Sequence, residues 1–168
     1  MLGWFVLPTD TSMPRIATAL LLFAAAVTTA GCRPETPVPP GDVAAQLAVP
    51  GTDGNVFDPA TLRGKPALVV FWRPGCPHCL AELPDAARAA AERGVPAIAV
   101  QVAGSPDAGR AVLDKLGWTG PALVDDGRLR TNLKIKAVPL TLVLRPDGTA
   151  RKAMVGRQSY DAMHSALR

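Results

Sequence analysis

Two cysteines, Cys76 and Cys79, are separated by two residues and are the side chains of this protein best suited to covalent chemistry. They follow the continuous apolar run Ala67 to Trp72, a pattern typical of a strand buried on both faces. An alanine-rich segment with helical periodicity begins at the pair. Because residues at this helical spacing bring their sulfurs within bonding distance, we expect the pair to alternate between two thiols and a disulfide.

The position of the pair at a helix N-terminus gives each cysteine a role. Unpaired backbone N–H groups and the helix dipole stabilise an anion there, so we expect Cys76 to be the attacking thiolate and Cys79 the resolving thiol. Pro77 withholds an N–H group that the helix would leave unused, and His78, when protonated, adds a positive charge beside the Cys76 thiolate. Both residues are expected to favour the reduced form, which raises the reduction potential.

The segments that must position this pair alternate between predicted strands and helices. A helix is expected from Cys76 to Arg93, and the order Pro146-Asp147-Gly148 predicts the turn of a β-hairpin. The turn cluster Thr52 to Asn55, between apolar pieces around Leu47 and Val56, predicts an added N-terminal β-hairpin. Strands are expected at 67–72, 97–102, 122–124, 140–144 and 150–155, and further helices at 107–116, 126–133 and 160–167. This order predicts an α/β fold with a central mixed sheet and helices on both faces.

Several short motifs stand in an order that resembles one known branch of proteins. They are Leu62-Arg63-Gly64-Lys65-Pro66, Phe71-Trp72, Cys76-Pro77-His78-Cys79, Glu82-Leu83-Pro84, Lys115-Leu116-Gly117, Ala137-Val138-Pro139-Leu140-Thr141 and Pro146-Asp147-Gly148. Together they resemble the TlpA/ResA branch of the thioredoxin superfamily. The resemblance implies a thioredoxin-like fold and a thiol-disulfide oxidoreductase that needs no bound cofactor beyond its own disulfide.

The same resemblance assigns further site residues. The proline that matches Pro139 is cis in that family, packs beside the disulfide and helps to dock the substrate chain through short strand-like backbone bonds. We therefore expect Val138, Pro139 and Trp72 to form the substrate-binding surface.

Glu82 matches a glutamate thought to tune thiol protonation in that branch. Thioredoxin itself has a buried aspartate at the position of Val70, so Glu82 is the nearby candidate for proton transfer with Cys79. A solvent-facing helix glutamate would look the same in the sequence, and this alternative stays open.

Two features bear on the direction of electron flow and on the choice of substrate. The framework resembles reductants that serve cytochrome maturation, whereas the central Pro77-His78 dipeptide resembles that of the oxidant DsbA. The family commonly has Trp immediately before the first cysteine, but this chain has Gly75 after Arg73-Pro74, which gives a basic and less aromatic rim. The reduction potential of the cysteine pair is predicted to be that of an oxidant. The direction of electron flow in the cell stays open because a membrane partner can keep a strong oxidant reduced.

Other functions are less consistent with the residues present. A structural zinc site needs four ligands, and the chain offers only Cys76, Cys79, His78 and the distant His164, so no metal site is expected. The Pro-x-x-x-Thr/Ser-x-x-Cys pattern of peroxiredoxins is not found around Cys76. The main alternative is a copper-binding or copper-delivery lipoprotein of the Sco type, although that family has a wider cysteine spacing. A non-catalytic protein that uses the disulfide only as a staple is the remaining rival.

The N-terminal residues predict export. Ile16 to Val27 is an uncharged apolar run of twelve residues, shorter than the ~20 needed to cross a bilayer and suited to a signal peptide. Only Arg15 precedes it as a cation, and Met13 is the predicted start. The end of the run, Thr29-Ala30-Gly31-Cys32, resembles a lipoprotein processing site with Thr29 in place of the usual aliphatic residue, so Cys32 is the expected lipidation site. Ordinary cleavage or an uncleaved anchor are the alternatives.

We therefore divide the chain into a signal peptide (1–31), a lipidated cysteine with a Pro-rich linker (32–41) and a thioredoxin-like domain (42–168). The 168 residues leave no room for a second catalytic domain, and the charged fraction of 19% argues against disorder. The net charge of +4 comes without basic runs interleaved with aromatics, so nucleic acid is not an expected partner. Expected partners are protein thiols or disulfides, a membrane redox protein that recharges the site, and a bacterial membrane on its periplasmic side; the protein is expected to be a monomer.

Overall fold

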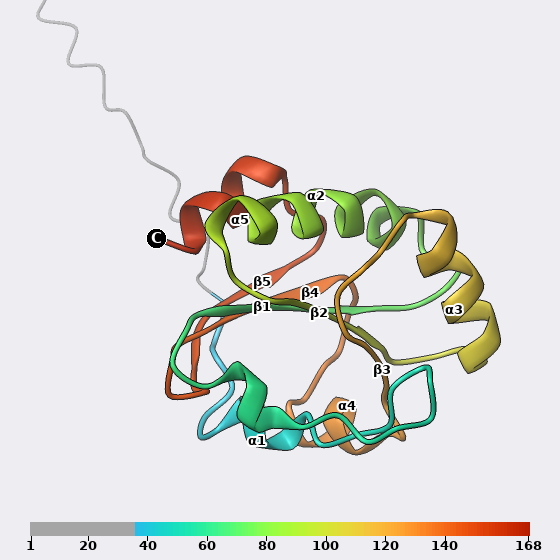
Figure 1. Cartoon of the computed structure of the whole chain (residues 1–168), viewed down its shortest axis with the longest axis horizontal. Helices are drawn as coiled ribbons and strands as arrows, with labels where there is room; N and C mark the ends of the chain where they lie inside the picture. The colour runs from blue at the N-terminus through green and yellow to red at the C-terminus, as the bar shows by residue number, and fades with distance from the viewer. Residues whose placement is uncertain (1–35) are drawn as a thin grey trace, which may run out of the picture. The chain divides into compact units, whose positions relative to one another are not determined.

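The computed structural model describes residues 36–168 (Figure 1). The predicted signal peptide, the Met13 start, the lipidation site Cys32 and the first residues of the linker lie outside the described residues. Between Thr36 and Arg168, no helix has both the length and the apolar character needed to span a bilayer.

Five strands form one mixed sheet at the centre of the fold. They are β1 (Ala67–Trp72), β2 (Ala97–Gln101), β3 (Ala122–Val124), β4 (Leu140–Leu144) and β5 (Ala150–Val155). Their order is β3-β2-β1-β4-β5, with β1, β2 and β3 parallel and β4 antiparallel to both β1 and β5. All six residues of β1 are buried, as the continuous apolar run predicts. The predicted mixed sheet is confirmed.

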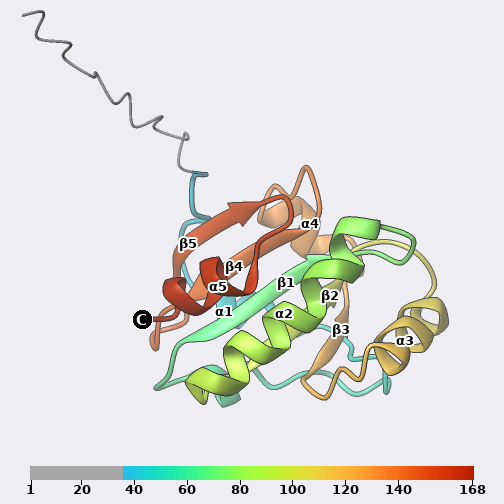
Figure 2. The same ribbon diagram turned by 90° about the horizontal axis from the view of Figure 1, so that it is seen from above.

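Helices cover both faces of this sheet (Figures 1 and 2). They are α1 (Val43–Gln46), the 3-10 helix η1 (Pro59–Leu62), α2 (Pro77–Arg93), α3 (Pro106–Lys115), α4 (Arg128–Asn132) and α5 (Tyr160–Ala166). Side chains of α2, α3 and α5 share one hydrophobic cluster with Leu68, Val70 and Trp72, while those of α1, η1 and α4 share the other with Val69 and Phe71. The alternation of β1 residues between the two clusters places the central strand in the middle of a three-layer fold.

The segment that precedes β1 follows the edges of the sheet. In the stretch for which an N-terminal hairpin is expected, the chain makes a single antiparallel bridge between Pro50 and Val56, and short helix α1 comes just before it. Thr52 donates its N–H to the carbonyl of Ala122 at 2.8 Å, so this stretch also pairs with edge strand β3. A further bridge joins Thr36 to Ala153 of β5 at the opposite edge. Both sheet edges are therefore partly covered, which limits edge-to-edge association.

Candidate active site

The two cysteines form a disulfide at the carboxyl end of the central strand. Cys76 and Cys79 are bonded, with their Cα atoms 5.3 Å apart. Cys76 precedes the first residue of α2, and Cys79 lies within its first turn. Cys76 is 6% exposed and Cys79 is 0% exposed. An incoming thiol or disulfide can therefore reach Cys76 more readily than Cys79.

The N-terminus of α2 directs a backbone donor at the Cys76 sulfur. Cys76 is the N-cap residue, and its Sγ accepts a hydrogen bond from the N–H of Cys79 at 3.2 Å. Pro77 occupies the first helical position, where a missing N–H has no cost. Pro77 and His78 are both exposed. When the disulfide opens, the same N–H and the helix dipole are placed to stabilise a thiolate on Cys76.

A cis peptide bond precedes Pro139, as the family resemblance implies. Pro139 is buried and leads directly into β4, whose first residue Leu140 pairs with Phe71 near the end of β1. The carbonyl of Pro139 accepts a hydrogen bond from the N–H of Gly156 at 2.9 Å. Val138 is half-buried, and its N–H and carbonyl form no hydrogen bond with any residue between 36 and 168. These two backbone groups are available to pair with an extended chain.

Glu82 lies one turn after Cys79 on α2 and faces the protein interior. The side chain is 0% exposed, so the alternative of a solvent-facing glutamate is wrong. The hydroxyl of Thr141 donates to Oε1, and the N–H of Gln158 donates to Oε2 at 2.7 Å. Burial raises the pKa of the Glu82 carboxyl above its usual range, against the lowering effect of the two hydrogen bonds. A buried carboxyl of this kind can hold or release a proton close to the resolving cysteine.

Trp72 lies behind the disulfide and not on a surface. It is 0% exposed and belongs to the same hydrophobic cluster as both cysteines. It was expected in the substrate-binding surface, but in this structure it offers no area to a substrate because α2 and the neighbouring strands cover it. Its indole Nε1 has no hydrogen-bond partner among residues 36–168.

The second histidine is part of the packing between α2 and α5. His164 stacks on Tyr160 with ring centroids 5.2 Å apart, and its Nδ1 lies 3.3 Å from Nη2 of Arg93. Within the described part of the chain, no group of three His, Cys, Asp or Glu side chains is arranged to hold a metal ion. His164 therefore has a structural environment, as its distance in sequence from the cysteines suggests.

Thr141 and Gln158 were not singled out by the sequence as site residues. Both contact Glu82 across long separations, from β4 and from the loop between β5 and α5. The one signal in the sequence was a threonine within the otherwise apolar run Leu140 to Leu144. The backbone N–H of Gln158 leaves no signal in the residue types.

The strand order β3-β2-β1-β4-β5, with a Cys-x-x-Cys disulfide after the central strand and a cis-proline before the adjacent one, places this protein in the thioredoxin-fold class. Within that class the chain belongs to the AhpC/TSA family, whose sequence profile matches residues 40–153.

Two groups of relatives support the predicted branch. The soluble secreted antigen MPT53 of Mycobacterium tuberculosis is 32% identical over 107 residues, which cover 62% of each chain. The match thus spans less than two thirds of that relative's length. Thiol-disulfide oxidoreductase ResA of Bacillus subtilis is 24% identical over 131 residues, which cover 76% of this chain and 73% of ResA. The resemblance to the TlpA/ResA branch is confirmed.

Solved structures show the same arrangement. A secreted Mycobacterium tuberculosis disulfide oxidoreductase, described as homologous to E. coli DsbE, matches with a TM-score of 0.67 and 27% identity over 76% of this chain and 98% of its own. The dsbF protein of the same bacterium, solved in mixed oxidised and reduced forms, matches with a TM-score of 0.65 and 30% identity over 74% of this chain and 98% of its own.

Proposed function

We propose that this protein is an extracytoplasmic thiol-disulfide oxidoreductase that exchanges disulfides with protein substrates through Cys76-Pro77-His78-Cys79. The observation that carries the proposal is the disulfide at the start of α2, with the Cys79 N–H directed at Cys76 Sγ. The names of the relatives, which include disulfide oxidoreductases, support the same reaction. A disulfide that served only as a staple would not require a helix N-terminus at the more exposed sulfur.

The reaction consists of two exchange steps. In the reducing direction, the Cys76 thiolate attacks a substrate disulfide, a Cys76–substrate disulfide forms, and the other substrate sulfur leaves as a thiolate. The Cys79 thiol then loses its proton and attacks Cys76 Sγ, which closes the Cys76–Cys79 bond and releases the second substrate sulfur. Two electrons pass from the protein to the substrate. An external dithiol must then supply two electrons to the protein to reduce the Cys76–Cys79 disulfide again. In the oxidising direction the same steps run backwards.

Two neighbouring groups have roles in these steps. The free N–H and carbonyl of Val138 pair with the substrate backbone beside Pro139, which holds the substrate sulfur near Cys76. Glu82 accepts or returns the Cys79 proton, because its buried carboxyl lies one turn along the same helix. No cofactor other than the disulfide is needed for this cycle.

The first experiment is a measurement of the reduction potential. The full-length protein, with Cys32→Ser so that only two thiols react, is equilibrated with glutathione mixtures in neutral detergent and read by alkylation and mass. A potential near the ~−120 mV of DsbA would support disulfide donation, and one at or below the ~−270 mV of thioredoxin would support a dedicated reductant. A pair that does not equilibrate with glutathione at all would refute the proposed activity.

The location is proposed from the N-terminal sequence and from the relatives. We expect removal of residues 1–31, lipidation of Cys32 and attachment to the periplasmic side of a bacterial membrane, where a membrane protein recharges the site. The relatives named as secreted support export. Mass analysis of the mature N-terminus tests this location: a diacylglyceryl group on Cys32 supports it, and an unprocessed Met13 or Met1 refutes it.

Copper delivery of the Sco type is the alternative. Two thiols and His78 could bind Cu(I), although no described contact favours it over exchange. Titration of the reduced protein with Cu(I) against a competing chelator separates the two functions. Peroxide reduction is disfavoured because Val69 and Arg73 occupy the Pro and Thr/Ser positions of the peroxiredoxin pattern.

A further inference from the structure

The loops that border the disulfide carry basic side chains and no carboxylates. Residues 73–76 contain Arg73, residues 133–139 contain Lys134 and Lys136, and residues 156–159 contain Arg157. None of these three stretches contains Asp or Glu. All four cationic residues are exposed.

Hydrogen bonds bring these three loops to the same end of the sheet. Leu140, the first residue of β4, pairs with Phe71 on one side and with Val155 on the other. The stretches that follow Trp72, precede Leu140 and follow Val155 are therefore neighbours. Bonds from the 156–158 stretch to the Pro139 carbonyl and to the Glu82 carboxylate fix this arrangement.

The charges of these residues are largely unneutralised. Within residues 36–168, Arg73, Lys134 and Lys136 form no ion pair, and Arg157 has one long contact, 3.9 Å to Asp85. Asp85 is shared with Arg88. A solvent-exposed pair of this length contributes little, so the rim beside the cis-proline keeps a net positive charge.

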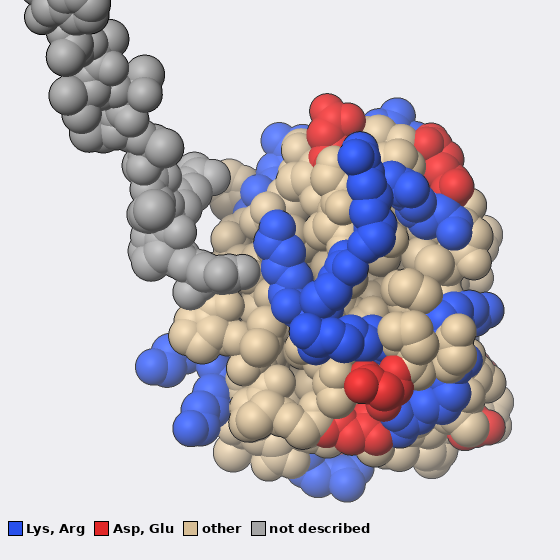
Figure 3. Space-filling model, turned by 90° about the vertical axis from the view of Figure 1, so that its left-hand side faces the viewer, with Lys and Arg blue, Asp and Glu red and all other residues tan. Residues whose placement is uncertain are grey.

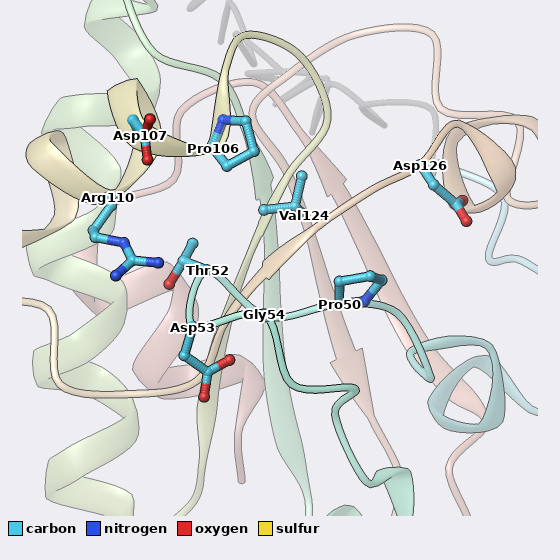
Figure 4. A pocket seen from close by; sticks show the side chains of 10 residues that line it. Pro50, Thr52, Asp53, Gly54, Pro106, Asp107, Arg110, Val124 and Asp126 are labelled. Carbon is cyan, nitrogen blue, oxygen red and sulfur yellow. The ribbon is translucent and has the colours of Figure 1, made fainter.

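A group of aspartates lies on the other side of the disulfide, toward α3. A pocket of about 520 Å³ after β2 and β3 is lined by Asp53, Asp107 and Asp126 with Arg110 among them (Figure 4). The loop that leads to this pocket adjoins the active-site loop, because a Cβ placed on Gly104 would lie 3.4 Å from the ring of Pro74. Arg128 pairs with Asp126 at 2.7 Å and Arg110 lies beside the other two aspartates, so the net charge is positive on the cis-proline side and only weakly negative on the α3 side.

We propose that the preferred substrate has acidic residues next to its reacting cysteine, and that this acidic segment lies across the cis-proline side of the site. The inference rests on the proposed function and names its substrate class. Cations within reach of the docked chain accelerate its association and stabilise the thiolate that leaves when the substrate disulfide is attacked. The α3 side, where Arg110 and Arg128 offset two of the three aspartates, offers no net positive charge, so the acidic segment crosses Val138 on the cis-proline side.

A preference for acidic substrates could also come from the net positive charge of the whole protein, so the test must distinguish net charge from the charge of the rim. Lys and Arg side chains also gather on the left-hand face of Figure 1, where the chain ends and the β4–β5 turn lies (Figure 3). Lys65 precedes β1 at the end of the strand opposite to Cys76, and it is exposed. A substitution of Lys65 therefore changes net charge without changing the rim.

The test compares three disulfide peptides that differ only in the residues flanking the cysteine, which are Asp, Ser or Lys. Each is mixed with the reduced full-length protein carrying Cys32→Ser in neutral detergent, and each rate is divided by that peptide's rate with 2-mercaptoethanol. At about 10 mM salt we expect the Asp peptide to react about tenfold faster than the Lys peptide. At about 1 M salt, where screening acts within about 3 Å, the ratio should approach one.

Two charge reversals locate the effect. Lys136→Glu should lower the Asp-to-Lys peptide ratio about fivefold, because the reversed charge slows the Asp peptide and accelerates the Lys peptide. Lys65→Glu, with the same change in net charge, should leave the ratio unchanged. Equal rates for the three peptides, or equal effects of the two variants, would overturn the acidic-substrate inference while the exchange activity stands. Exchange with none of the peptides would instead refute the proposed function.

Discussion

Replacing Thr141 with valine removes one hydrogen bond from the buried Glu82 carboxylate and keeps the side-chain shape. The Thr141 hydroxyl and the Gln158 N–H are the two donors to this carboxylate, and the Glu82 side chain is shielded from water. A hydrogen bond to a charged group contributes about 1.5–3 kcal/mol, and the added buried methyl returns about 0.8 kcal/mol. We therefore expect Thr141→Val to destabilise the protein by about 1–2 kcal/mol at pH 7, or about 3–8 °C in Tm.

The pH dependence of this loss follows from the direction of the pKa shift. Burial already raises the pKa of Glu82 above its usual value of 4.5, and losing the Thr141 bond to the charged form raises it further. A raised pKa means that the folded state binds more protons than the unfolded state, so stability is present below pH 4.5 and is lost as pH rises through the folded pKa. The difference between wild type and Thr141→Val should therefore grow as pH rises above 4.5.

Denaturant unfolding of the oxidised protein between pH 4 and pH 8 measures this difference, with Thr141→Ser as the matched variant that keeps the hydroxyl. Thr141→Ser should follow the pH profile of wild type, offset by the lost methyl. A loss of stability that is the same at all pH values, or the same for valine and serine, would show that the loss comes from altered packing and not from the missing hydrogen bond to the carboxylate. The reduction potential of Thr141→Val should also change its slope with pH if Glu82 exchanges a proton with Cys79.

Three further outcomes are expected. Cys76→Ser should abolish exchange, whereas Cys79→Ser should accumulate mixed disulfides with substrate that are visible by mass; exchange by Cys76→Ser would contradict the assignment of the attacking thiol. His78→Gly should lower the reduction potential in the glutathione assay, and an unchanged potential would remove the argument for an oxidising poise. Gly109→Ala should destabilise the protein by about 2–4 kcal/mol in denaturant unfolding, because its Cβ would overlap the buried amide of Gln101 and disrupt the bonds of that amide to two backbone carbonyls. A denaturation midpoint of Gly109→Ala equal to that of wild type would show that the Gln101 side chain can move to accommodate the new methyl group.

Local patterns in the sequence were sufficient for most elements of the fold. The strands predicted at 122–124, 140–144 and 150–155 have those bounds in the structure, and α2 begins after Cys76 and ends at Arg93, with Gly94 as its C-cap. These elements depend on short-range signals, such as an apolar run, a Pro-Asp-Gly turn or a capping residue, that act within a few positions. The cysteine pair and its place at a helix N-terminus follow from the same local information.

Long-range contacts decided the rest of the site. Thr141 and Gln158 close over the Glu82 carboxylate and bury it. These two residues lie 59 and 76 positions after Glu82 in the chain. The stretch around Pro50 also pairs with edge strand β3, which no local pattern shows. Trp72 was expected at the surface, but its side chain is fully buried in the hydrophobic cluster that it shares with α2. The sequence by itself therefore determined which atoms can react, while only the tertiary structure decided which of them meet water, which face a carboxylate and where a substrate chain can lie, because burial depends on residues far apart in the chain.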